Sequence, residues 1–463
     1  MMACVAVVSA YRPAWSATPV QAEITYPSTV TNDSEGPLDL RAELNYDSSR
    51  RDAPIAVVMH PYGGVDPNLS NNAQRLRDAG FFVISPAMRG QGGSDGTRDS
   101  GGAEIYDIYD AVEYVKSSYA QYVDSTNVSI TGYSGGGGNV MSALTKFPDY
   151  FRAGSAFFGM SDYGYNTTNG WFFNGADAGN KGSLIPDIGD PSTNNPAIQD
   201  RYMARASNLA SKNNPYSMIH LFVNANETNV PPVNDTSYRD NAIAAASSPG
   251  EFNNIHVHIG GTGQYIDFNS NNVNDPDELQ DWPHQLPTAN QQHAAESWYL
   301  SRLLDGSIAE PTLNLRDTLF VAGFVKTQEF GLWLGDGQNA AGELKYELGD
   351  QSRSFDFHLL TNDKTVTGTL TVDTSKWEGL QLTAKLNGSI IDTIQGGGVY
   401  RLTNLAHGDQ LTLAVIPEAT SLMHLWIGTI GIVSCARRAQ LRFDPGRIIG
   451  GFADQLSSQS PSD

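Results

Sequence analysis

The segment Asn127–Asn139, NVSITGYSGGGGN, decides how the rest of the chain is organised. Asn127–Thr131 is predicted to be a short buried strand, since it is rich in β-branched residues. Gly132-Tyr133-Ser134-Gly135-Gly136 follows as a G-x-S-x-G pattern, and Asn139–Phe147 is predicted to be a helix. A strand, a sharp glycine turn and a helix form the context in which this pattern lifts a serine above a sheet edge.

Each small residue of this turn has a physical reason. The turn holds Ser134 in a strained backbone conformation, so glycine at positions 132 and 136 removes side chains that would clash. The N–H of Gly135, at the start of the helix, would face a negatively charged oxygen formed at the serine. The alternative is a glycine-rich turn that contains a serine by chance.

Outward from this segment, strands and helices alternate. Ile55–Met59 is a continuous apolar run, as expected for a central parallel strand that is buried on both faces. This alternation predicts an α/β fold with a doubly wound, mostly parallel sheet. The predicted strands are Ala42–Tyr46, Ile55–Met59, Phe81–Ile84, Gly154–Phe158, Ile219–Val223 and Ile255–Ile259, and the predicted helices are Asn71–Ala79, Glu104–Tyr119 and Gln291–Leu304.

A chain of 463 residues is too long for one ordinary domain. We expect an α/β domain at 23–310, in which the aromatic- and Gly/Asn-rich stretch 161–214 forms a cap over the site. Residues 311–415 show short alternating runs with turn signals such as Asn387-Gly388, which predicts a C-terminal β-sandwich.

The two ends of the chain differ from its middle. Residues 1–22 are predicted to be a secretory signal peptide, with cleavage after Ala17 or Ala22, although a buried first strand is an alternative. Cys4 and Cys435 both lie in predicted targeting segments, so we expect a mature protein without cysteine. A net charge of −21 argues against nucleic acid as a partner.

Candidate partners for Ser134 follow later strands. A serine needs a base within hydrogen-bond reach and an acid that orients the base. After the strand Ile219–Val223 the chain reads Asn224-Ala225-Asn226-Glu227-Thr228-Asn229-Val230-Pro231-Pro232. This pattern resembles the α/β-hydrolase superfamily, most closely its dienelactone hydrolase and prolyl-oligopeptidase-like branch, in which an Asp precedes x-x-Val-Pro.

The resemblance implies roles for particular residues. Glu227 occupies the position of the acid, with Asp235 and Asp162 as rivals, and His284 between the last strand and the last helix would be the base. His60-Pro61-Tyr62-Gly63-Gly64 resembles the H-G-G oxyanion loop. Because proline has no N–H, the second oxyanion donor beside Gly135 would be the N–H of Tyr62.

A loop before His284 has the spacing of a calcium site. Its oxygens stand at positions 1, 3, 5, 9 and 12 of an EF-hand-type loop, but position 6 is Asn272 rather than glycine. A structural Ca²⁺ is therefore one interpretation and a solvated loop the other, and no cofactor is required for the reaction. The candidate ligands are Asp267, Asn269, Asn271, Asp275 and Glu278.

The segment 416–463 resembles a PEP-CTERM sorting signal. Pro417-Glu418 is followed by the apolar stretch Leu425–Val433 and by Arg437-Arg438. A last strand of the sandwich is the alternative. Together with the signal peptide, this resemblance implies a protein that is secreted or attached to the cell surface.

These expectations combine into a secreted serine ester hydrolase that uses Ser134, His284 and Glu227. Its substrates would be esters, including polymeric ones such as acylated polysaccharides or polyesters. One alternative is a prolyl-oligopeptidase-like serine peptidase, although the few dozen residues before Ile55 leave no room for that family's β-propeller. A non-catalytic cell-surface binding protein is the other.

Overall fold

The computed structural model describes most of the chain between residues 18 and 416. Two antiparallel strands, β1 (Pro19–Pro27) and β2 (Asp39–Asp47), form one edge of its first sheet. The described residues are 18–30, 36–62, 64, 70–261, 284, 295–296, 300–335, 339–349, 352–361 and 368–416.

The first sheet has eight strands in the order β1-β2-β4-β3-β5-β6-β7-β8. From β4 to β8 all neighbouring strands are parallel, whereas β2 is antiparallel to both of its neighbours, β1 and β4. This confirms the predicted doubly wound, mostly parallel sheet. The other strands are β3 (Ala53–Met59), β4 (Phe82–Pro86), β5 (Val123–Tyr133), β6 (Ala153–Phe157), β7 (Met218–Asn224) and β8 (Ile255–Gly260).

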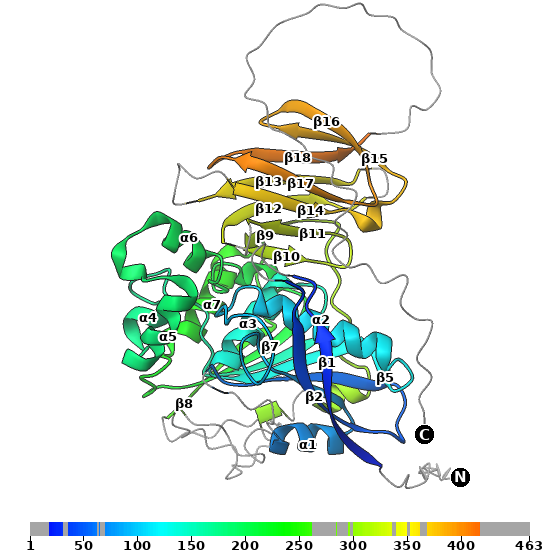
Figure 1. Ribbon diagram of the computed structural model, residues 1–463, viewed down its shortest axis with the longest axis vertical. Helices are drawn as coiled ribbons and strands as arrows, with labels where there is room; N and C mark the ends of the chain where they lie inside the picture. Colours follow the sequence, from blue (N-terminus) through cyan, green and yellow to red (C-terminus); the bar gives the residue numbers. More distant parts are fainter. Residues whose placement is uncertain are drawn as a thin grey trace, which may run out of the picture.

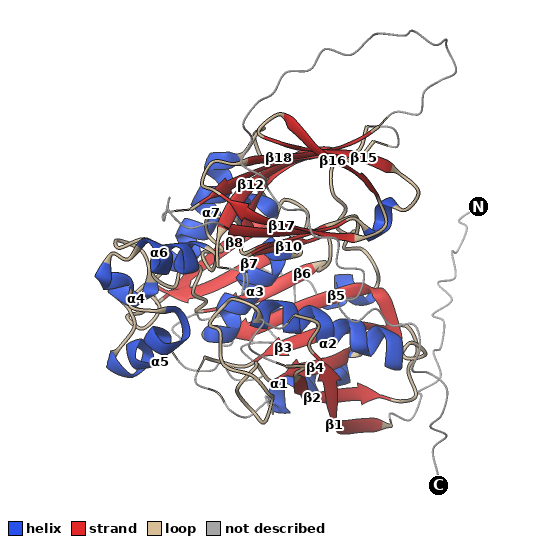
Figure 2. Cartoon of the chain, turned by 45° about the horizontal axis from the view of Figure 1, so that its top comes forward, coloured by secondary structure: helices blue, strands red, loops and turns tan. Residues whose placement is uncertain are grey.

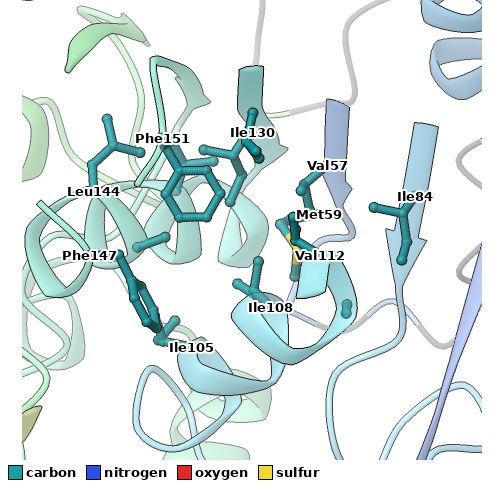
Figure 3. Close-up of a cluster of buried hydrophobic side chains, with 14 of the residues drawn as sticks. Val57, Met59, Ile84, Ile105, Ile108, Val112, Ile130, Leu144, Phe147 and Phe151 are labelled. Atoms are coloured by element: carbon teal, nitrogen blue, oxygen red, sulfur yellow. The ribbon is translucent and has the colours of Figure 1, made fainter. Parts of the chain in front are cut away.

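Helices cover both faces of this sheet (Figure 2). Alternate residues of one strand point to opposite faces, so Val57 and Met59 of β3 pack with α2 (Glu104–Ser118) and α3 (Gly135–Lys146). Ala56 and Val58 pack on the other side with α1 (Ser70–Ala79). Figure 3 shows the larger of these two cores, in which Ile105, Ile108 and Val112 of α2 meet the sheet.

Two elements differ from the sequence prediction. Strand β1 includes Pro19–Ala22, so of the two predicted signal cleavage positions only the one after Ala17 leaves β1 intact. Helix α7 (Val233–Ala245), between β7 and β8, was not predicted. Its apolar residues are few, and the residues that it buries include the polar side chains of Asn234 and Asp235 as well as Tyr238.

The expected cap is a set of short helices beside the carboxyl ends of the strands. They are α4 (Trp171–Asn174), α5 (Ala178–Ile188) and α6 (Pro196–Met203), with the 3-10 turns η1 (Pro191–Thr193) and η2 (Ser211–Asn213). Leu184 and Ile188 of α5 pack with Trp171 and Tyr202 in a small aromatic core of their own.

The C-terminal part is a β-sandwich of ten strands. Its hydrogen-bonded order is β16-β15-β18-β13-β12-β9-β10-β11-β14-β17, and the chain turns at Gly323, whose φ is +75°. Phe355 and Phe330, from the two layers, meet at 4.7 Å in its core. The strands are β9 (Arg316–Ala322), β10 (Phe324–Lys326), β11 (Gly331–Leu334), β12 (Ala341–Glu347), β13 (Ser354–Leu360), β14 (Gly368–Asp373), β15 (Gln381–Leu386), β16 (Ser389–Gln395), β17 (Val399–Leu405) and β18 (Gln410–Val415), and the 3-10 turn η4 (Ser375–Trp377) follows β14.

The sandwich sits directly on the first domain (Figure 1). Asn213 of the cap region donates to the carbonyl of Phe320 at 2.8 Å and accepts from the N–H of Phe320 at 2.8 Å. The buried ammonium of Lys146 donates to the carbonyls of Ala204 and Ala322. Polar groups from both domains thus satisfy one another in a buried interface.

Candidate active site

Ser134 stands on a sharp turn between β5 and α3. Its φ of 53° and ψ of −115° lie outside the regions that side chains usually adopt, so the turn is strained. A Cβ on Gly132 would lie 2.3 Å from the Gly136 carbonyl oxygen, and one on Gly136 would lie 2.4 Å from the carbonyl oxygen of Met59. Only glycine fits at either position, and the turn places Ser134 at the carboxyl end of the central strand.

The two expected oxyanion donors lie side by side. A Cβ on Gly135 would lie 2.5 Å from the backbone nitrogen of Tyr62, so the two backbones are in direct contact. Gly135 also begins helix α3, whose dipole favours negative charge at this end. The arrangement can hold an oxygen anion that forms next to Ser134.

His60 has a structural role in this loop. Its Nε2 accepts a hydrogen bond from the N–H of Met88 at 3.1 Å, so its Nδ1 carries the proton and donates to the carbonyl of Pro61 at 2.8 Å. Burial lowers the pKa of His60, which keeps the ring neutral in this arrangement. Both ring nitrogens are therefore used to hold the loop that presents Tyr62.

The structure brings Ser134, His284 and Glu227 together, with His284 between the other two. His284 Nε2 lies 3.2 Å from Ser134 Oγ, and His284 Nδ1 lies 3.2 Å from Glu227 Oε2. The Nδ1 contact has the distance of an ion pair without the straight angle of a good hydrogen bond. Such contacts are often loose in enzymes without substrate and tighten when substrate binds.

The environment of Glu227 keeps its carboxyl group ionised. Burial alone would raise the pKa, but the His284 imidazole beside the carboxylate and the hydrogen bond from the Asn229 N–H lower it below its ordinary value. Glu227 Oε1 accepts from the N–H of Asn229 at 2.5 Å. One carboxylate oxygen is thus fixed by the backbone, and the other faces the imidazole.

The two rival acids are used differently. The carboxylate of Asp162 accepts hydrogen bonds from the N–H groups of Gly164, Tyr165 and Asn166, and so closes the turn that opens the cap. Asp235 is fully buried in the first turn of α7, where neither carboxylate oxygen has a hydrogen-bond partner among the described residues. Burial raises the pKa of Asp235 well above its ordinary value, which disfavours the charged form that would stabilise an imidazolium.

A pocket of about 210 Å³ lies over Ser134. Trp171 of α4 lines it and donates its indole N–H to the carbonyl of Asn229, next to Glu227. No pattern in the sequence predicts this contact, because Trp171 lies in an irregular insertion more than fifty residues before its partner. The lining residues are Pro61, Tyr62, Tyr133, Ser134, Trp171, Asp177, Asn180, Asn229, Val230 and His284.

Several predicted features fall outside the described residues. These are the possible Ca²⁺ ligands Asp267, Asn269, Asn271, Asp275 and Glu278, both cysteines, residues 1–17 of the predicted signal peptide and the tail from residue 417. Within the described part of the chain, no cluster of His, Cys, Asp or Glu is arranged to hold a metal ion. No helix in that part is both long and apolar enough to cross a membrane.

Comparison with known proteins bears on this site. Residues 67–182, about a quarter of the chain, match the prolyl oligopeptidase family. The matched segment contains Ser134 and its glycine turn but not Glu227 or His284. The chain has the α/β-hydrolase fold, and its segment around Ser134 is similar to the prolyl oligopeptidase family.

Individual relatives match the chain only in part. An uncharacterized protein of Rickettsia prowazekii is 31% identical over 102 residues, which are 21% of this chain and 42% of that protein. The acylaminoacyl peptidase of Pyrococcus horikoshii has a TM-score of 0.44 at 15% identity, over 64% of this chain and 43% of that one. The chain spans less than half the length of these two relatives.

Two further solved structures are similar to the chain. A puromycin-hydrolyzing peptidase of Mycobacterium tuberculosis has a TM-score of 0.44 at 17% identity, over 63% of this chain and 39% of that one. An esterase of Pyrococcus furiosus has a TM-score of 0.37 at 13% identity, over 63% of this chain and 91% of that one. Similarity at this level supports no conclusion about substrate.

Proposed function

We propose that this hydrolase is a serine peptidase that cleaves small peptides or related amides through an acyl-enzyme. The observation that carries the proposal is the alignment of Ser134, His284 and Glu227, with 3.2 Å at each of the two contacts. The family match around Ser134 favours peptides over the polymeric esters expected from sequence. The small pocket favours a substrate with one modest side chain at the cleavage point.

The chemistry follows from the positions of the atoms. Ser134 Oγ attacks the carbonyl carbon while His284 Nε2 takes its proton, and the backbone N–H groups of Gly135 and Tyr62 bind the oxygen anion. His284 then gives the proton to the departing amine, which leaves an ester between Ser134 and the acyl group. Water, deprotonated by His284, attacks this ester and releases the acid and free Ser134. Glu227 stabilises the imidazolium in both steps.

Ester cleavage is the second function that this site supports. The same groups act on an ester, whose alkoxide leaving group departs more easily than an amine. A secreted esterase therefore stays a proposal, and the relative kcat/KM for matched peptide and ester substrates decides between the two. The wild-type protein should cleave p-nitrophenyl acetate under either proposal.

The test of the machinery is Ser134→Ala. We expect this change to lower kcat by about 10⁶-fold with little change in the melting temperature, because loss of the nucleophile disables the whole catalytic unit. A fluorophosphonate probe should label wild-type protein at Ser134 and leave the variant unlabelled. Absence of labelling in the wild type would instead support the non-catalytic binding protein.

A further inference from the structure

The side chain of Tyr62 is held by the cap. Its hydroxyl donates to Asp187 Oδ2 in helix α5 at 2.9 Å and lies 2.8 Å from the hydroxyl of Ser100. Burial raises the pKa of Tyr62, so its hydroxyl stays protonated and can donate at any working pH. The backbone N–H of the same residue is the proposed oxyanion donor.

Asp187 gathers several donors on one oxygen. Besides Tyr62, Ser100 donates to Oδ2 at 2.6 Å and Arg98 donates through Nε at 2.6 Å. The Arg98 guanidinium also lies over the Tyr62 ring, 4.7 Å from its centroid. The Asp187 side chain is only 9% exposed, so water competes little for these bonds.

The same cap also touches the acid side of the site. The Tyr62 ring meets Trp171 edge-on at 5.7 Å, and Trp171 in turn donates to the carbonyl of Asn229. The N–H of Asn229 donates to Glu227. Contacts therefore run without a gap from Asp187 through Tyr62 and Trp171 to the loop that holds Glu227.

We propose that Asp187 is a positioning residue that sets the place of the Tyr62 N–H through the Tyr62 side chain. This inference rests on the proposed function. Arg98 and Ser100 come from the loop after β4 and Asp187 comes from the cap, so their shared bonds fix the cap against the oxyanion loop. A donor displaced by about 1 Å can lower the rate by about 10²-fold, so small movements of α5 would be felt at Ser134.

The experiment compares Tyr62→Phe, Asp187→Asn and the double variant. Tyr62→Phe removes the hydroxyl but keeps the backbone N–H. We expect each single change to lower kcat for p-nitrophenyl acetate by about tenfold with KM nearly unchanged, because the oxyanion exists only in the transition state. If Asp187 acts through Tyr62, the double variant should be no slower than the slower single variant.

A matched control is Asp190→Asn, in the same cap. Asp190 caps η1 by accepting from the N–H of Ser192 at 2.9 Å and is not among the residues that line the pocket, so kcat should stay at the wild-type value. Ser100→Ala removes one donor to Asp187 and should lower kcat less than Asp187→Asn does. It also keeps the test decisive if Asp187→Asn fails to fold.

Three outcomes would overturn the inference: rate losses that multiply in the double variant, losses confined to KM, or Asp187→Asn and Ser100→Ala both at the wild-type rate. Fluorophosphonate labelling separates these from failure of the proposed function. If the probe labels Ser134 of the wild type but the cap variants have no effect on the rate, only the positioning role is wrong. If the probe does not label the wild type, the proposed function itself is wrong.

Discussion

The two sides of the active site are built from different parts of the sheet. Ser134 and Gly135 stand between β5 and α3, at the centre of the sheet, where every residue of α3 is buried. Glu227 and His284 follow β7 and β8, at the edge of the sheet, where only β7 has a strand on both sides. The covalent path of a tight turn fixes the first side, whereas contacts between separate loops hold the second.

The difference extends to the chemistry beneath each side. The central strands present apolar side chains to the core. The strands under the acid and base present His220, His256 and His258, with His258 Nε2 only 2.9 Å from His220 Nδ1. The turn at Ser134 and the histidine-containing strands β7 and β8 should therefore respond differently to substitution and to pH.

Apart from removal of the nucleophile itself, the largest effect should come from breaking the contact-held side. Glu227→Gln keeps the shape of the side chain but removes the charge that stabilises the imidazolium, so kcat should fall by about 10³- to 10⁴-fold. The measurement is steady-state kinetics on p-nitrophenyl acetate. Asp235→Asn is the matched control, because it makes the same acid-to-amide change at a buried carboxyl group of α7, and its kcat should match the wild type. Equal losses in both variants would contradict the assignment of Glu227.

A smaller effect should follow from crowding the turn-held side. In Gly135→Ala the added methyl group would lie 2.5 Å from the Tyr62 nitrogen and push the two oxyanion donors apart. Loss of one such donor lowers kcat by about 10²- to 10³-fold. Gly182→Ala in α5 is the control, since beyond its chain neighbours and the backbone of its own helix no described atom lies within 4 Å of its added Cβ. The idea fails if Gly135→Ala retains the wild-type kcat.

The smallest effect concerns pH. Burial lowers the pKa of His258 to about 4, so below its ordinary value of 6.5 the unfolded chain binds protons that the folded chain does not. Stability should therefore fall as the pH drops from 6.5 towards 4, by on the order of 2 kcal/mol. His258→Phe, whose ring can stack on Phe222 as His258 does, should flatten this slope in melting temperatures measured across pH. A parallel slope in both proteins would contradict this.

The sequence allowed one side of the site to be predicted more fully than the other. The glycine turn at Ser134 is local, so residues 132–136 carry nearly all of its geometry. Glu227 and His284 were predicted only through order along the chain and resemblance, with Asp162 and Asp235 left open. The choice among the three candidate acids depends on which carboxylate the backbone holds facing His284. This is a tertiary property that no spacing in the sequence encodes.

The cap shows the same limit. Its existence followed from the long Gly- and aromatic-rich stretch, but Asp187 and Trp171 lie in short helices with weak periodicity. Helix α7 was missed because its core-facing side is largely polar. The fold as a whole was predictable, since its apolar strands and the Asn387-Gly388 hairpin, with φ values of 51° and 78°, are set by neighbouring residues.

Phe324 lies in strand β10 of the sandwich, but its side chain packs in the core of the first domain. Its ring centroid lies 5.4 Å from those of both Tyr106 and Phe147. A chain cut before β9 would open this socket to water and strip Asn213 and Lys146 of the carbonyls of Phe320 and Ala322. The two domains should therefore evolve together. A different sandwich could replace this one only if the surfaces of α2 and α3 that contact Phe324 changed with it.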